Sequence, residues 1–346
     1  MATGVTAAIA RPFATIFHRW PVLLLLALSP GIPEYLSGSS SFELLLVNPV
    51  VFFLFLGLNL GLYGPGVLLI REAIVRWQKG WTTLLLLGAA YGLLEEGTAL
   101  STLFDPHASV VSGLGFYGHY LGVNWIWVIG ILQIHAVYSI GLPILLCGLA
   151  LPETRGRMLL TDRQIRILFL IYFLDIVFLV LLTHYWAGSL QIVLAVMVAA
   201  GLIGLAYRLP ARILEPPTLL PRWRPTAFLL LGLAFFPILL LVPSVGEHLG
   251  WAAPVTGAVE ILFSGILLGV IRGTIGRSGQ APHVVLLAIG AIAPLILIGL
   301  LAQIFIPIVL VADFLAVFFF LSLWRRYRSE DATSAALPPV LPGRRA

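Results

Sequence analysis

Charged side chains are scarce in this sequence: they make up 10% of its 346 residues, whereas hydrophobic residues make up 60%. Soluble globular proteins carry about 25% charged residues, so this composition excludes a water-soluble fold. Polar stretches long enough to form a soluble domain are also missing. We therefore expect residues 1–328 to form one integral membrane domain with the lipid bilayer as its partner. The polar, proline-rich residues 329–346 are expected to form a disordered cytoplasmic tail.

Cysteine is almost absent. The single cysteine, Cys147, excludes an internal disulfide and a cysteine-based zinc site. The His-Glu-x-x-His spacing of many zinc hydrolases is missing as well. The net charge of +5 does not indicate nucleic acid as a partner, because Lys and Arg beside apolar segments have another role at membrane surfaces. The sequence therefore names no cofactor, although its Glu and His side chains could hold a metal ion.

Long apolar segments, in contrast, fill the chain, and they predict an all-α polytopic membrane protein of about ten transmembrane helices. They cover residues 20–36, 44–70, 81–104, 123–151, 167–186, 190–207, 227–245, 251–271, 284–302 and 304–324. The first is short and follows basic residues, as the core of a signal peptide does, but we expect it to be retained because no cleavage site follows it. Only Gln303 and Pro307 separate the last two segments, which could also form one kinked hairpin.

The positions of the basic residues predict the orientation of these segments. All 20 Lys and Arg residues lie before the first segment or after an even-numbered one. Membrane proteins retain such residues on the cytoplasmic side. A ten-helix protein of the cell membrane with both termini in the cytoplasm therefore satisfies the rule for every basic residue. Trp125 and Trp127 then form part of an interfacial belt at the outer start of the fourth segment.

Two adjacent carboxylates in the third segment, Glu95 and Glu96, are the main functional signal. Charge at such depth is costly and indicates a partner, a proton or a bound ion. At a rise of about 1.5 Å per residue, Glu96 lies about 12 Å below the outer surface, Glu260 about 14 Å and His135 about 18 Å, so the three share a layer. Adjacent helical residues point about 100° apart, so we expect only one of the two glutamates to face the site, without a preference for either. Gly92, four residues before Glu96, would let another helix come close.

Further polar residues lie within the apolar segments. Glu34 and His184 are shallower on the outer side, Asp175 is near the middle of the membrane, and Asp313 is level with Glu260. Taken singly, the acids Glu34, Asp175, Glu260 and Asp313 are better explained by pairing within the fold than by function. The doubled glutamate is different, because two adjacent acids near a histidine cost more than one helix contact requires.

The paired glutamates, followed by a histidine on the next segment, resemble the CPBP family of intramembrane proteases, which includes the type II CAAX prenyl endopeptidases. The family pattern is Glu-Glu-x-x-x-Arg, then Phe-x-x-x-His, then His-x-x-x-Asn. Glu95 and Glu96 match the acids, His135 the first histidine and His184 the second, over residues 81–190. Leu100, Ile131 and Gly188 stand where the family has Arg, Phe and Asn. The resemblance implies a glutamate that activates water for peptide hydrolysis and histidines that stabilise the oxyanion.

The leading hypothesis is thus an intramembrane hydrolase in which Glu95 or Glu96 is the base and His135 and His184 assist. The alternative is a carrier that binds a proton, a cation or a small substrate, because the proline-containing breaks at 64–66 and 237–243 lie in corresponding helices of two five-helix halves. A non-catalytic scaffold or a lipid-binding subunit is the third hypothesis. The substrate of the first two would be a membrane-embedded peptide or a small molecule.

Overall fold

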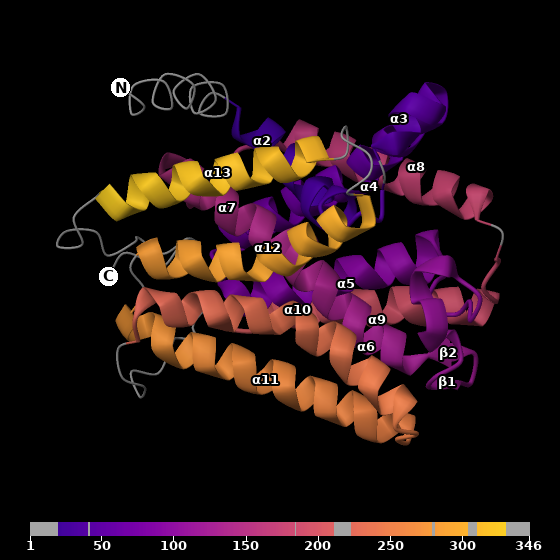
Figure 1. Cartoon of the computed structure of the whole chain (residues 1–346). Coiled ribbons are helices and arrows are strands. Elements are labelled where there is room, and N and C mark those ends of the chain that lie inside the picture. Colours follow the sequence, from indigo (N-terminus) through magenta and orange to yellow (C-terminus); the bar gives the residue numbers. More distant parts are fainter. Residues whose placement is uncertain are drawn as a thin grey trace.

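The computed structural model describes residues 20–40, 42–183, 185–210, 223–278, 281–303 and 310–329. Apart from one pair of two-residue strands, the elements of these residues are helices, which confirms the all-α membrane fold class (Figure 1). The elements are α2 (Pro21–Pro30), η1 (Gly31–Tyr35), α3 (Glu43–Val47), α4 (Pro49–Trp77), α5 (Trp81–Leu94), η2 (Glu95–Ala99), η3 (Ser109–Gly115), β1 (His119–Tyr120), β2 (Val123–Asn124), α6 (Trp125–Ile134), η4 (His135–Gly141), α7 (Leu142–Ala150), η5 (Pro152–Thr154), α8 (Asp162–Leu182), α9 (Ser189–Arg208), α10 (Pro225–His248), α11 (Ala253–Ser278), α12 (Ala281–Gln303) and α13 (Leu310–Ser329). Among them η1, η2 and η4 are π-helical turns, and η3 and η5 are 3₁₀ turns. The expected tail at 329–346 lies outside the described residues, except for its first residue.

The predicted number of ten membrane-crossing helices is wrong. Within the described residues, seven helices are long and apolar enough to cross a membrane. They are Pro49–Trp77, Trp125–Ala150, Asp162–Leu182, Ser189–Arg208, Pro225–His248, Ala253–Thr274 and Ala281–Leu301. The first predicted segment forms only the short apolar helix Pro21–Tyr35, and the third changes from α to π geometry after 14 residues. The last two predicted segments correspond to α12 and α13, which pack against each other, and the residues that connect them lie outside the described part of the chain.

Three hydrogen bonds join the helix ends that carry Lys and Arg residues. We call this part of the molecule the basic end of the bundle. Arg71, near the end of α4, donates a 2.6 Å hydrogen bond to the Thr154 carbonyl in the α7–α8 connection. Lys79 donates to the Leu209 carbonyl after α9 at 2.6 Å. At the end of α13, the Tyr327 hydroxyl donates to the carbonyl oxygen of Leu149 at 2.8 Å. We propose that the basic end is the cytoplasmic one, as the positive-inside rule requires.

Cysteine labelling tests this orientation. In a chain whose Cys147 has been replaced by alanine, cysteines at the exposed positions Ser39, Ser109 and Glu247 are expected to react with an impermeant thiol reagent added to intact cells. A cysteine at Thr161, also exposed but at the basic end, should react only after the membrane is permeabilised. Labelling of Thr161→Cys in intact cells would reverse the proposed orientation.

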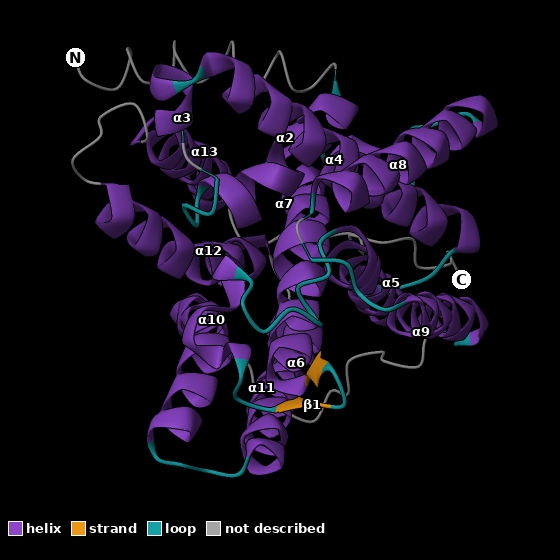
Figure 2. Cartoon of the chain, turned by 90° about the vertical axis from the view of Figure 1, so that its right-hand side faces the viewer, coloured by secondary structure: helices purple, strands orange, loops and turns teal. Residues whose placement is uncertain are grey.

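The connection between η2 and α6 is compact. It contains the 3₁₀ turn η3 and the antiparallel pair β1–β2, which lies beside the start of α6 in the second view (Figure 2). Asn124 holds this connection to the helix: its side chain accepts a hydrogen bond from the Trp127 amide and donates to the Leu114 carbonyl at 2.6 Å. An asparagine at the N-cap commonly satisfies a free amide in this way.

Two glycines let α5 approach η4 closely. A β-carbon at Gly88 would stand 2.6 Å from the Ala136 Cα, and one at Gly92 would stand 3.0 Å from the His135 side chain. At Gly88 the backbone of α5 thus approaches the backbone of η4, and at Gly92 it approaches the His135 side chain. The close approach expected at Gly92 is therefore present, and the segment that it admits carries His135.

Candidate functional site

Glu95, Glu96 and His135 form one buried cluster. Glu96 Oε1 lies 3.0 Å from His135 Nε2, and Glu95 Oε2 lies 3.3 Å from His135 Nδ1. The two carboxylates thus bracket the imidazole, one at each ring nitrogen. The expectation that only one glutamate faces the site is wrong, because both flexible side chains reach the same ring from adjacent positions. The exposed fraction of the side chains is 2% for Glu95, 8% for Glu96 and 3% for His135.

All three π-helical turns of the described chain carry polar residues of this region. Glu95 and Glu96 begin η2, His135 begins η4, and Glu34 lies in η1. The η1 and η4 turns pack against each other, as do α5 and η4. Single π turns inside α-helices are rare, and those that do occur are often found at functional sites. Hydrophobic spacing does not reveal them, because a π turn differs from an α turn by only one residue.

Neighbouring side chains orient the carboxylate and the imidazole. The Thr102 hydroxyl donates to Glu96 Oε2, and the Trp127 indole N–H donates to the Thr102 hydroxyl at 3.2 Å. His135 Nδ1 also lies 3.1 Å from the Ser139 hydroxyl, one turn further along η4. Trp127 is thus a support of the buried cluster besides being an aromatic residue near the helix start. Its spacing from Thr102 in the sequence gives no indication of this role.

Tyrosine rings surround the imidazole on the α4 and α5 sides. The ring of Tyr91 meets it edge-on at 5.6 Å between centroids, and the ring of Tyr63 stacks against it at 6.4 Å. The Tyr63 hydroxyl donates to Glu34 Oε1 at 2.6 Å, and the Ser40 hydroxyl donates to the other oxygen of Glu34 at 2.9 Å. Both carboxylate oxygens of Glu34 therefore accept hydrogen bonds, as expected of a structural acid. Tyr63 lies between Glu34 and the imidazole of His135.

The remaining predicted acids, Glu260, Asp313 and Asp175, lie apart from the imidazole. Glu260, on α11, accepts a 3.3 Å hydrogen bond from Gln133 on α6, so it shares a layer with His135 without contacting it. Asp313 lies near Gly299 at the contact of α12 and α13. Asp175, on α8, points toward Gly61 of α4. His184, the expected second histidine, lies outside the described residues.

The cluster has the donor set of a metal site. Glu95, Glu96 and His135 each offer one ligand atom, and these atoms lie within 4.8 Å of one another. One imidazole nitrogen and two carboxylate oxygens are competent zinc ligands. A metal bound there would act as a Lewis acid on a water molecule or a carbonyl group. The same three side chains can instead share protons, because the two acids already contact the imidazole directly.

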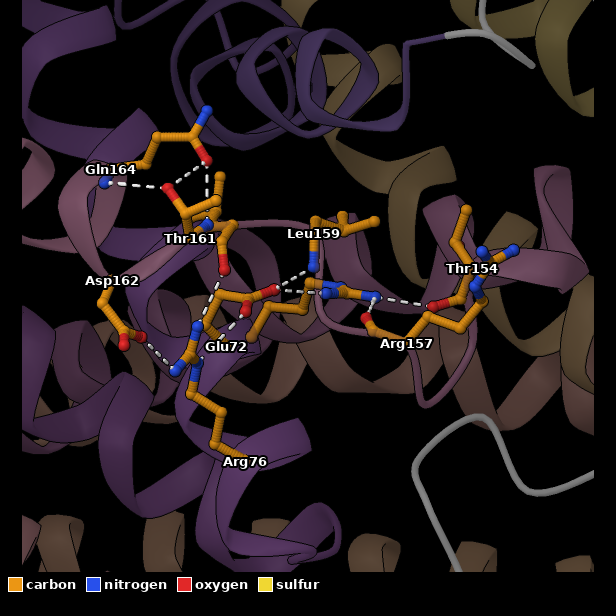
Figure 3. Close-up of polar contacts among 10 residues, drawn as sticks. Glu72, Arg76, Thr154, Arg157, Leu159, Thr161, Asp162 and Gln164 are labelled. Atoms are coloured by element: carbon orange, nitrogen blue, oxygen red, sulfur yellow. Dashed lines mark hydrogen bonds and ion pairs between the residues drawn. The ribbon is translucent and has the colours of Figure 1, made fainter.

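A second buried polar group, at the basic end, was not predicted (Figure 3). Arg71 and Glu72 form an ion pair of 2.6 Å, and their side chains are only 7% and 2% exposed. Glu72 also accepts a 2.8 Å hydrogen bond from the Leu159 amide, and Arg71 donates to the carbonyls of Thr154 and Arg157. The pair thus clamps the 151–161 connection onto α4. Glu72 is the only acid among the basic residues from 71 to 79. This feature of the sequence could have indicated an ion pair.

The fold and the buried Glu–Glu–His cluster define a polytopic helical membrane protein with a polar site inside its apolar region. The family whose model matches residues 23–335 is described as an uncharacterized membrane protein family. This match covers most of the chain, so the chain belongs to that family. No curated protein and no solved structure matches the chain.

Proposed function

We propose that this protein is an intramembrane hydrolase in which Glu96 activates water and His135 stabilises the charge that develops on the substrate. The observation that carries the proposal is the direct 3.0 Å contact between Glu96 and His135 in surroundings that exclude solvent. A carboxylate can accept a proton from water, and an imidazole that gains a proton can donate a hydrogen bond to an oxyanion. The attacking water molecule would bind between the two side chains, in place of their direct contact.

Two features support Glu96 as the base, and a resemblance supports the chemistry of the pair. Its side chain is the more exposed of the two glutamates, and its carboxylate is oriented by Thr102 and His135. The resemblance to the CPBP proteases assigns the same chemistry to the paired acids and to His135. Leu100, Ile131 and Gly188 depart from that family's pattern, so the proposal covers amide or ester hydrolysis in the membrane rather than cleavage of prenylated peptides in particular.

Substitution by glutamine tests the role of Glu96. Glutamine keeps the size of glutamate, but its amide cannot accept the proton, so Glu96→Gln is expected to lower hydrolysis by about 10²–10⁴-fold. The products are to be sought as new protein N-termini and released lipid fragments in membranes that contain either the wild type or the variant. Glu95→Gln, assayed in parallel, shows whether the second acid shares this role.

Glu260→Gln is the matched control, because Glu260 is a buried membrane glutamate that does not contact His135. It should release the same products as the wild type. Thermal unfolding in detergent establishes that each variant is folded. Identical products from the wild type and from folded Glu95→Gln and Glu96→Gln variants would end the hydrolase proposal.

A further inference from the structure

On the α8 side of the cluster, four buried polar atoms make no hydrogen bond of ordinary geometry within the described part of the chain. They are the hydroxyl oxygens of Tyr91 and Tyr172, Asp175 Oδ2, and Glu95 Oε2, which contacts only His135 Nδ1, at 3.3 Å. Nearly all buried polar atoms in proteins have a partner, and each exception requires an explanation such as a bound ion or water. Four exceptions on α5, η2 and α8, of which η2 packs against both helices, indicate a common cause.

The four side chains face the same compartment. Tyr91 lies near the end of α5, and Glu95, four residues later, begins η2. Tyr172 and Asp175 are three residues apart on α8, so each pair lies on one helix face. The two tyrosine rings stack at 6.0 Å between centroids, and α8 packs against η2.

Asp175 is directed into this region by its contact with α4. A β-carbon at Gly61 would stand 2.6 Å from Asp175 Oδ1, so the carboxylate occupies the space that glycine leaves open. The other carboxylate oxygen, Oδ2, is shielded from solvent. The acid is thus held between α4 and α8 rather than in contact with lipid alone.

The balance of charge shows what kind of ligand is needed. Glu95, Glu96 and Asp175 supply three carboxyl groups, and among the described residues the basic group in contact with the first two is His135. Even a protonated imidazole would neutralise only one carboxylate. Uncompensated charge is costly in the apolar part of a membrane, so the remaining acids must bind protons or another cation.

We propose that Tyr91, Glu95, Tyr172 and Asp175 form a binding site for a monovalent cation, with sodium as the ion to be tested. Carboxylate and phenol oxygens are hard ligands of the kind that such a cation prefers, and the ion would satisfy all four atoms at once. It would hold Glu95 on the α8 side and leave Glu96 and His135 as the reacting pair. The site does not depend on the proposed hydrolysis.

The stability of the full-length protein in detergent tests this site. Its unfolding temperature is measured over a sodium chloride series in which choline chloride keeps the ionic strength constant, and again with potassium chloride. A cation that binds only the folded protein raises the unfolding temperature. The wild type should show a saturating rise of several degrees with sodium, Asp175→Asn should lose it, and Tyr172→Phe, which removes one oxygen but keeps the ring, should require more sodium.

Asp313→Asn is the matched control, because Asp313 is a buried acid away from this compartment, and its sodium response should equal that of the wild type. Glu96→Gln should also keep the response, which separates this site from the hydrolytic function. An equal rise with choline, or a stability that depends on pH but not on sodium, would overturn the proposal. If Asp175→Asn does not fold, a sodium response of Tyr172→Phe identical to that of the wild type would do the same.

Discussion

Replacing Glu72 by alanine is expected to lower the free energy of unfolding by about 3–5 kcal/mol, because removing one partner of a buried ion pair leaves the other charge uncompensated. The charge left behind is the Arg71 guanidinium, which is 7% exposed and lies 2.6 Å from Glu72 in the native protein. Arg71 would keep its two carbonyl acceptors, but neither of these carries a charge.

The same substitution should release the 151–161 connection. Glu72 accepts the Leu159 amide hydrogen bond, so that amide loses its partner as well. Denaturant unfolding in detergent measures the loss of stability, and limited proteolysis shows whether the connection becomes accessible. Cleavage is expected within 151–161 in Glu72→Ala and not in the wild type.

Asp162→Ala provides the matched control at the same end of the bundle. Asp162 also forms a 2.6 Å ion pair, with Arg76, but its side chain is 80% exposed. Exposed ion pairs contribute little to stability, so this variant should unfold almost as the wild type does. The double variant Arg71→Met, Glu72→Leu removes both buried charges and should recover most of the loss. Equal destabilisation by Glu72→Ala and Asp162→Ala would contradict the importance assigned to burial.

Gly88→Ala is the second substitution with a large expected effect, although it adds only one methyl group. That methyl carbon would stand 2.6 Å from the Ala136 Cα, so α5 and η4 must separate. Overpacking of this kind costs about 1–3 kcal/mol. Because Ala136 follows His135 directly, the separation should also increase the distance between the imidazole and the two glutamates. The hydrolysis proposed for this site should then fall together with stability.

Gly57→Ala distinguishes overpacking from a general effect of alanine. A β-carbon at Gly57 meets nothing within 4 Å, and alanine favours a helix by about 1 kcal/mol relative to glycine. Gly57→Ala should therefore leave the thermal unfolding temperature unchanged or raise it, whereas Gly88→Ala should lower it by several degrees. A stable Gly88→Ala protein with full activity would show that α5 and η4 can move apart without harm.

The apolar segments predicted the fold class, because continuous apolar runs of about 20 residues satisfy their backbone in lipid as helices. The number of crossings was less predictable. Segment 20–36 has the composition of a span, yet its helix ends at Tyr35 after 15 residues, and segment 81–104 loses its α geometry at Glu95. Composition does not report where a helix changes its hydrogen-bonding pattern.

Depth estimates placed Glu96 and His135 in one layer, and the two side chains are in contact. The same estimates also placed Glu260 in that layer, although it contacts another face of α6 through Gln133. Depth alone cannot choose between helix faces. The tyrosine hydroxyls beside Glu95 were missed for a related reason, since only the packing of α8 against η2 brings Tyr172 to this site.

Because of the π turn at Glu95, the geometry of the buried cluster depends on the number of residues in η2. A residue deleted within η2, such as Gly97, would allow an ordinary α turn to form and would rotate the residues after it by about 100° relative to those before it. Thr102 would then leave Glu96, while every chemically important side chain remained in the sequence. Transfer of the glutamates and the histidine to regular helices at the same depth should likewise fail to reproduce the cluster. The insertion of single residues into helices is therefore as much a part of this site as its acids.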